Sequence, residues 1–289
     1  MKNRAIIILA IFIVIVIGSF FIIRSCVGTN DDQIKDSITT NVPKPINLSI
    51  YLDLSDRIKP DGSASLSQKE KDMAIVEYLT NYVKDKAVKE KILPCKDRIK
   101  VFFYPAPSDS KIAMLSEKLE LDLGTTEMAA KKKTLIEFGG EFKSSMEQIY
   151  TSTINTSNWQ GSDIWGFFNK PIDNYCIKDG YRNILVVLTD GYIFYAPDKR
   201  QDGDASNFIL NQTLSNAHSK LLVGREDLPK LDNLEVLMLE LNPDPLSYQP
   251  KMEQVIMNWL KEMGVEKCYV GETDVPSNTK LIIENFLNE

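Results

Sequence analysis

The segment at residues 182–191, RNILVVLTDG, constrains the fold more than any other part of the sequence. Its five consecutive apolar residues, ILVVL at 184–188, have no polar residue between them. A strand of this kind is buried on both faces, as in a parallel sheet that helices cover on either side. Thr189, Asp190 and Gly191 follow directly. The sequence therefore predicts a central parallel strand that ends in a carboxylate.

A second strand of the same character lies at residues 47–57, NLSIYLDLSDR. Its leucines and isoleucine alternate with serine, tyrosine and aspartate, which is the period of a strand. The far end carries Asp53, Ser55, Asp56 and Arg57. In open α/β sheets the carboxyl ends of the strands form the edge where ligands bind. A polar turn after the strand is the alternative interpretation, because Asp and Ser are favoured turn residues.

The rest of the chain alternates strands with amphipathic helices, which is typical of a parallel sheet covered on both faces. We predict an α/β fold with a doubly wound, mostly parallel central sheet of Rossmann-like type, in which residues 47–54 and 183–190 are adjacent at the centre. Leucines spaced through residues 108–124 fit a β-excursion or a short helix, and we favour the β-excursion. The other expected strands are 98–104, 233–241 and 268–270, and the expected helices are 67–91, 126–150 with an interruption at Gly139-Gly140, 209–222, 250–263 and 280–287.

The amino terminus has the length and composition of a membrane span. Residues 5–23 contain nineteen residues without a charge, enough to cross the hydrocarbon core of a bilayer as a helix. Residues 27–45 are polar, contain two prolines and show no periodicity, so they read as a linker. We therefore expect a membrane anchor at 1–26, a linker at 27–45 and one α/β domain at 46–289.

Lys2 and Arg4 precede the apolar segment and favour a cytoplasmic amino end, although Arg24 directly after the segment weakens that bias. The expected protein is a single-pass membrane protein whose domain lies outside the cytoplasm, in the periplasm or the extracellular space. Two alternatives remain at this point. The segment could be a cleaved signal peptide, or Cys26 could be lipidated as in a lipoprotein.

Composition and residue counts exclude two classes of function. The net charge is −6, and the one run of basic residues is Lys131-Lys132-Lys133, so the footprint of a nucleic-acid-binding protein is absent. The chain has a single histidine, His218, and four widely separated cysteines. Neither a CxxC nor an HExxH pattern occurs, which argues against a zinc site.

Three short motifs, taken in order, resemble the metal-ion-dependent adhesion site of von Willebrand factor A-type (VWA) domains. The DxSxS motif of that family corresponds to Asp53-Leu54-Ser55, which follows the first strand. Ser162 in the sequence GSDI stands where the family usually has a threonine, and Asp190 in LTDG corresponds to the late aspartate. The resemblance implies a VWA-like fold for residues 46–289. It also implies a metal site formed by Asp53, Ser55, Ser162 and Asp190.

Arg57 occupies the position of the third ligand in this motif, and a guanidinium has only hydrogen-bond donors and cannot bind a cation. Two outcomes are open. Arg57 could point away, so that the remaining oxygen ligands and water hold Mg²⁺, an ion that retains several waters. Alternatively, the Arg57 guanidinium could lie between Asp53 and Asp190 and neutralise them in place of a metal.

The leading hypothesis is a membrane-tethered, VWA-like module without catalytic residues. The resemblance implies that it engages a still unknown protein partner at the carboxyl edge of the sheet, through a divalent cation if one binds. A metal-dependent hydrolase of the haloacid dehalogenase type is the main alternative, but its general-acid aspartate would stand at position 55, where this chain has serine. A purely structural component of an envelope complex is the third possibility.

Overall fold

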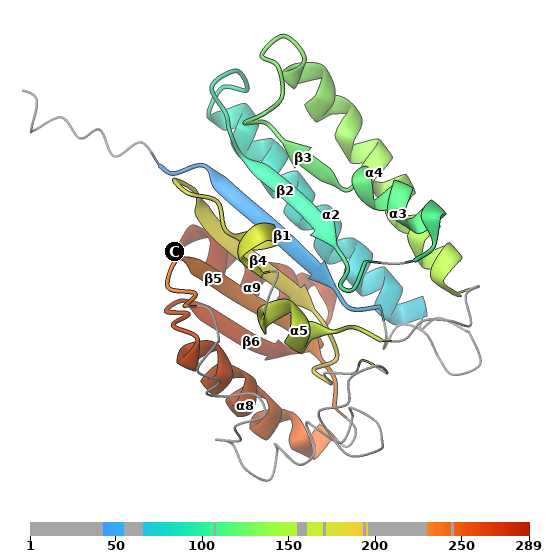
Figure 1. Ribbon diagram of the computed structural model, residues 1–289, viewed down its shortest axis with the longest axis vertical. Coiled ribbons are helices and arrows are strands. Elements are labelled where there is room, and N and C mark those ends of the chain that lie inside the picture. The colour runs from blue at the N-terminus through green and yellow to red at the C-terminus, as the bar shows by residue number, and fades with distance from the viewer. Residues whose placement is uncertain are drawn as a thin grey trace, which may run out of the picture. The chain divides into compact units, whose positions relative to one another are not determined.

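Six strands form one sheet in the order β3-β2-β1-β4-β5-β6 (Figure 1). The two strands with the longest apolar patterns, β1 and β4, are paired in parallel at its centre, with Ile50 opposite Val186. Among the described strands, only β3 at the edge runs antiparallel to its neighbour. The predicted mostly parallel α/β sheet is therefore confirmed. The strands are β1 (Ile46–Leu52), β2 (Arg98–Phe102), β3 (Glu120–Asp122), β4 (Arg182–Leu188), β5 (Leu234–Leu241) and β6 (Cys268–Glu272).

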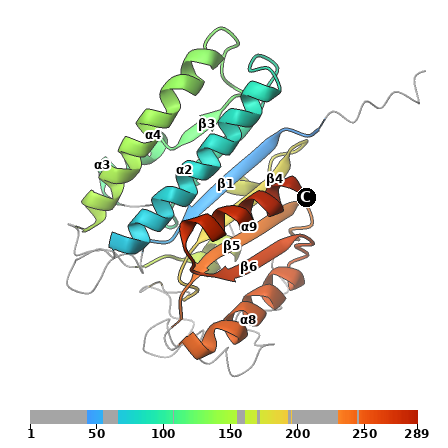
Figure 2. The same cartoon turned by 180° about the vertical axis from the view of Figure 1, so that it is seen from behind.

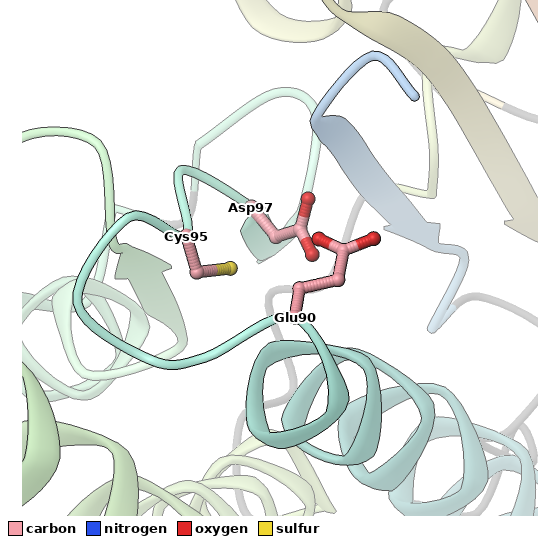
Figure 3. Close-up of side chains that lie close together, drawn as sticks. All are labelled: Glu90, Cys95 and Asp97. Carbon is pink, nitrogen blue, oxygen red and sulfur yellow. The ribbon is translucent and has the colours of Figure 1, made fainter. Parts of the chain in front are cut away.

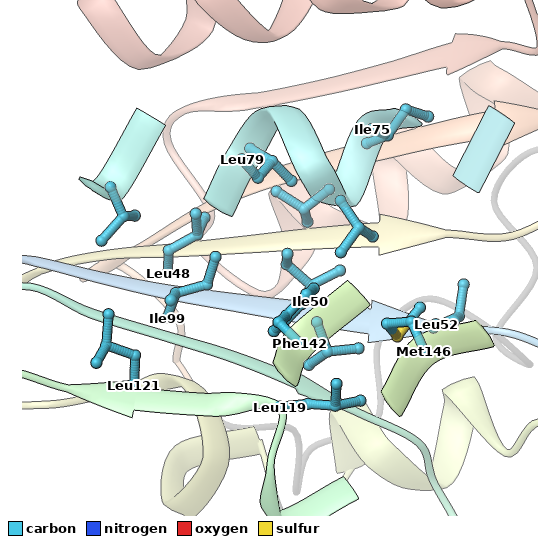
Figure 4. Packing of buried hydrophobic residues seen from close by; sticks show 14 of the residues in the cluster. Leu48, Ile50, Leu52, Ile75, Leu79, Ile99, Leu119, Leu121, Phe142 and Met146 are labelled. Atoms are coloured by element: carbon cyan, nitrogen blue, oxygen red, sulfur yellow. The ribbon is translucent and has the colours of Figure 1, made fainter. Parts of the chain in front are cut away.

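Helices cover both faces of this sheet (Figures 1 and 2). The helices that pack on one face are α2 (Leu66–Lys89), α4 (Lys131–Ile154) and α9 (Pro276–Asn288), and those on the other are α5 (Ile164–Asn169), α6 (Ile172–Cys176) and α8 (Gln249–Glu262). The alternation in β1 explains the two layers. Leu48, Ile50 and Leu52 point into the core beneath α2 and α4 (Figure 4), while Tyr51 joins the aromatic core beneath α5.

Residues 108–124 do not form the β-excursion that we expected. They contain the helix α3 (Ser110–Glu117), and only Glu120–Asp122 is a strand. The side chain of Asp109 accepts hydrogen bonds from the backbone N–H groups of Lys111 and Ile112, at 2.8 and 3.3 Å. This cap satisfies backbone donors that the first turn of a helix leaves unpaired. The spaced leucines therefore belong to the buried face of one helix and to the buried strand that follows it.

The predicted interruption of α4 at Gly139-Gly140 is also wrong, because the helix is continuous from Lys131 to Ile154. Its buried face carries Leu135, Phe138, Phe142 and Met146. Packing of an amphipathic face supplies most of the stability of a helix in a protein, so it outweighs the low helix propensity of two glycines.

One irregularity lies near the carboxyl end of β5, where the register with β6 shifts between Met238 and Leu241. Glu240 in this shift has φ of 71°, a left-handed conformation that is uncommon outside glycine. Its carboxylate is buried and accepts hydrogen bonds from Gln68 Nε2 at 3.0 Å and Thr273 Oγ1 at 2.6 Å. Such shifts re-aim a side chain, and here they direct a carboxylate toward the start of α2.

The computed structural model describes residues 43–54, 66–106, 108–154, 161–169, 172–192, 195, 230–243 and 246–289. Lys44–Glu289 form one compact unit. No helix within these ranges is long and apolar enough to cross a bilayer. The expected membrane span at 5–23 and the expected helix at 209–222 lie outside the described residues.

Candidate functional site

The carboxyl ends of β1 and β4 meet at the centre of the sheet, where the strand order changes direction. The chain proceeds from β1 outward to β2 on one side, and from β4 outward to β5 on the other. The backbone N–H of Asp53 donates to the carbonyl of Leu188 at 2.9 Å, which continues the pairing one residue past both strands. Ligands bind in the crevice at such a switch point in open α/β sheets.

Asp53 is fully buried directly after β1. Its Oδ2 accepts a hydrogen bond from Thr189 Oγ1 at 2.9 Å, and Thr189 Oγ1 in turn accepts one from the backbone N–H of Gly191 at 3.2 Å. The next carboxylate, Asp190, accepts a hydrogen bond at Oδ1 from the N–H of Tyr192 at 2.8 Å. Threonine therefore fixes the first aspartate, and the turn after β4 fixes the second.

Ser162 reaches the same edge on a loop that precedes α5. The backbone N–H of the next residue, Asp163, donates to the carbonyl of Tyr104 at 3.0 Å, and Gly161 forms a bridge with Tyr195 in the loop after β4. The loop is thus held between the end of β2 and the segment that follows Asp190. The Ser162 side chain is 1% exposed, and its hydroxyl has no hydrogen-bond partner within the part of the chain that the structure describes.

The surroundings of the Tyr51 hydroxyl connect Asp53 with the loop that carries Ser162 and Asp163. It donates to the carbonyl of Tyr104 at 2.9 Å. Burial raises the pKa of Tyr51 well above its usual value, the neighbouring carboxylates Asp53 and Asp163 raise it further, and the Ser162 hydroxyl lowers it. Ser162 Oγ therefore lies near Tyr51, although it does not complete a hydrogen bond of normal geometry. Two carboxylates and the Ser162 hydroxyl therefore lie within electrostatic reach of the Tyr51 hydroxyl.

The structure thus places three of the predicted site residues, Asp53, Ser162 and Asp190, at one edge of the sheet. Ser55 and Arg57 lie outside the described residues, so both roles considered for Arg57 remain predictions. Thr189 was not predicted as a site residue, although it is part of the LTDG motif. Asp163 was also missed, and its Oδ1 accepts the N–H of Gly166 at 2.8 Å, which orients the loop that carries Ser162.

The donor set at this edge consists of oxygen atoms, two of them on carboxylates and one on a buried hydroxyl. Hard cations such as Mg²⁺ and Ca²⁺ prefer oxygen ligands. A buried hydroxyl without a partner costs free energy, so an unsatisfied one calls for an explanation, such as a ligand or ordered water. The residues present therefore fit a hard divalent cation.

A second group of potential metal ligands, Glu90, Cys95 and Asp97, lies at the opposite, amino-terminal edge of the sheet (Figure 3). Lys86 already neutralises it, because its Nζ lies 2.8 Å from Glu90 Oε2 and 2.9 Å from Asp97 Oδ2. Asp97 Oδ1 also accepts the backbone N–H of Ile46 at 2.7 Å. Burial raises the pKa of the Cys95 thiol to about 11, and the neutral thiol is a poor metal ligand. This group therefore has a structural role at the start of the domain.

No protein-family model and no curated protein matches the chain. Among solved structures, it is similar to the pilus adhesin SpaC from Lactobacillus rhamnosus GG in its open conformation, at 13% sequence identity and a TM-score of 0.38. The matched region covers 84% of this chain and 30% of the adhesin chain. Similarity at this level assigns neither a family nor an activity. The α/β fold described above rests on the strand order and the two packed layers of helices.

Proposed function

We propose that this chain is a membrane-tethered, VWA-like binding module that engages a protein partner at the carboxyl edge of its sheet through a divalent cation, with Mg²⁺ preferred. The single observation that carries the proposal is the buried hydroxyl of Ser162, which has no hydrogen-bond partner among the described residues and lies near Tyr51, a residue whose pKa the carboxylate of Asp53 also raises. The proposed ligands are Asp53, Ser55, Ser162 and Asp190. In the family that these motifs resemble, an acidic side chain of the partner completes the coordination sphere, and no bond is broken.

Several contacts support a rigid site. Thr189 holds Asp53 by a buried hydrogen bond, and the backbone of Tyr192 holds Asp190. Preorganised ligands lose little conformational entropy when the cation binds, so they raise its affinity. The sequence argues against a hydrolase of the haloacid dehalogenase type, because its general-acid aspartate would stand where this chain has Ser55.

The tether is the part of the proposal that rests on the sequence. Residues 5–23 are long and apolar enough to span a bilayer, and residues 27–45 connect them to the domain. The proposed orientation places the domain outside the cytoplasm, because Lys2 and Arg4 stand on the amino side of the span.

Calorimetric titration of Mg²⁺ into the full-length chain in detergent tests the cation site. We expect binding by the wild type, its loss in Asp190→Ala and Ser162→Ala, and tighter binding in Arg57→Ser, which restores the family motif. Glu141→Gln is the matched control, since it removes an exposed carboxylate on α4 far from the site. Absence of binding in every variant would contradict the metal site.

Binding by the wild type that is unchanged in Arg57→Ser would mean that Arg57 points away from the cation. Stabilisation of the wild type by Arg57, without any Mg²⁺ binding, would assign the neutralising role to the guanidinium. A panel of phosphoesters, assayed with Mg²⁺, separates the binding module from the hydrolase. Turnover that is lost in Asp53→Asn would overturn the proposed function.

A further inference from the structure

The amino-terminal edge of the sheet carries a surface of exposed apolar and basic side chains. Val88 near the end of α2, Leu93 in the following loop and Met128 before α4 are 60%, 53% and 64% exposed. We call the surface formed by these three residues and the neighbouring exposed lysines the amino-edge corner. The ends of α2 and α4 that form it lie side by side, at the end of the domain where β1 begins, in both Figure 1 and Figure 2.

A buried lysine holds this corner in place. Lys131 in the first turn of α4 is 7% exposed, and its Nζ donates to the carbonyl oxygens of Leu93 at 2.9 Å and Cys95 at 2.7 Å. The loop after α2 is therefore tied to the start of α4. Lys86 links the same loop to β1, because Asp97 accepts hydrogen bonds from both Lys86 and the backbone of Ile46. The exposed apolar side chains thus stand on a rigid base.

The charge of the corner is basic, although the whole chain has a net charge of −6. Among the described residues, Lys133 makes a long ion pair with Glu137 at 3.8 Å, and no ion pair engages the other four exposed lysines. Four exposed acidic residues lie nearby, of which Glu90 is bound to Lys86 and Glu137 is the residue paired with Lys133. The exposed lysines are Lys89, Lys91, Lys96, Lys132 and Lys133, and the exposed acidic residues are Asp85, Glu90, Glu127 and Glu137.

From this arrangement we infer that the amino-edge corner docks on an anionic lipid surface. Apolar side chains enter the boundary between headgroups and acyl chains, while lysines contact lipid phosphates and keep their charge in water. The point of entry of the chain favours lipid over a protein partner. The described domain begins at Lys44, and β1 starts two residues later at this same edge. The inference rests on the tether of the proposed function, which would hold this edge near a bilayer.

The test uses the full-length chain reconstituted in vesicles that contain a lipid with a quencher in its headgroup. An environment-sensitive fluorophore is attached at Met128→Cys or, as the matched control, at Met114→Cys, in a background with Cys26→Ser and Cys268→Ser. Met114 is 55% exposed on α3, which follows the carboxyl end of β2, so the two labels lie at opposite edges. Vesicles of phosphatidylcholine alone are compared with vesicles that also contain phosphatidylglycerol.

We expect stronger quenching at Met128→Cys than at Met114→Cys, and an increase of the Met128→Cys signal when phosphatidylglycerol is added. The double change Lys89→Glu/Lys132→Glu should lower the docked fraction about tenfold or more, and high salt should act in the same direction. Equal quenching at the two positions would overturn the inference. The inference would also be overturned if quenching at Met128→Cys changed neither with lipid charge nor with the lysine substitutions, since a tether alone produces that result.

Flotation of the same vesicles separates this inference from the tether. A chain that floats with neutral vesicles but shows no quenching at Met128→Cys retains the tether and overturns the docking surface. A chain that floats only with anionic vesicles, and no longer does so after the lysine changes, supports the docking surface and shows that residues 5–23 do not anchor the chain. Energy transfer between Met128→Cys labels on neighbouring copies, without lipid quenching, would assign the corner to self-association and overturn the inference.

Discussion

Replacing Ser162 by alanine should stabilise the metal-free protein and abolish cation binding. The Ser162 side chain is 1% exposed, and its hydroxyl has no hydrogen-bond partner among the described residues. A buried, unsatisfied hydroxyl costs about 1–3 kcal/mol. Removing one oxygen leaves only a small void, which offsets part of that gain. We therefore expect the free energy of unfolding to rise by about 1 kcal/mol in Ser162→Ala when the buffer contains a chelator.

Saturating Mg²⁺ should reverse this order. A ligand that binds only the native state stabilises it by about 2.7 kcal/mol at a concentration one hundred times its dissociation constant. The wild type gains this stabilisation from Mg²⁺ and Ser162→Ala does not, so the wild type becomes the more stable protein in Mg²⁺. Urea unfolding followed by circular dichroism, with chelator and with Mg²⁺, measures both differences.

Ser49→Ala is the matched control for this experiment. Ser49 is also 1% exposed, but its hydroxyl donates to the carbonyl of Tyr175 at 3.2 Å. Losing that bond should destabilise the protein by about 1 kcal/mol in either buffer. If Ser162→Ala destabilises the chelated protein as Ser49→Ala does, the hydroxyl has a structural partner. That result would refute a ligand at this edge.

Three further outcomes are expected. Gly191 has φ of 93°, and a Cβ added there would overlap Met252 Sδ. Denaturant unfolding of Gly191→Ala should therefore show a free energy of unfolding lower by about 2–4 kcal/mol, and calorimetry should show weaker cation binding, because the neighbouring Asp190 shifts. Burial favours a higher pKa for Glu235, but the two hydrogen bonds from Arg182, both at 2.7 Å, lower the pKa below its usual value. The stability that this ion pair contributes is present above the unfolded-state pKa and is lost as the pH falls through the folded-state pKa. The melting temperature of Glu235→Gln should therefore fall less steeply in acid than that of the wild type. Burial raises the pKa of Cys176 to about 12, so mass spectrometry should find alkylation of this thiol at pH 8 only after unfolding, and rapid labelling of the native protein would contradict its burial.

The central sheet was predictable because its signal is local. Alternation in β1 and the apolar run in β4 each specify which side chains are buried, and two buried parallel strands must pair near the centre of a sheet. The pairing of Ile50 with Val186 follows this logic. Residues 108–124 were misread because their leucines fit two periods, and the deciding signal was the helix cap at Asp109.

The candidate site was predictable only in part. Asp53 and Asp190 converge because parallel strands end at one edge of a sheet, which follows from topology alone. The hydrogen bond between Thr189 and Asp53 joins residues 136 positions apart, and no periodicity in the sequence indicates such a contact. The Ser162 hydroxyl lacks a hydrogen-bond partner among the described residues because of how three separate segments pack, and no sequence pattern indicates this.

The buried carboxylate of Glu240 makes distant parts of the chain depend on one another during unfolding. It joins the first turns of α2 through Gln68 to the segment before α9 through Thr273, and Thr279 Oγ1 within α9 lies 3.4 Å from its other oxygen. Opening either helix would take a hydrogen-bond donor away from this buried carboxylate, which costs about 1–3 kcal/mol. We therefore expect the two helices to open together, as one cooperative unit in hydrogen exchange, although nearly two hundred positions separate them in the sequence.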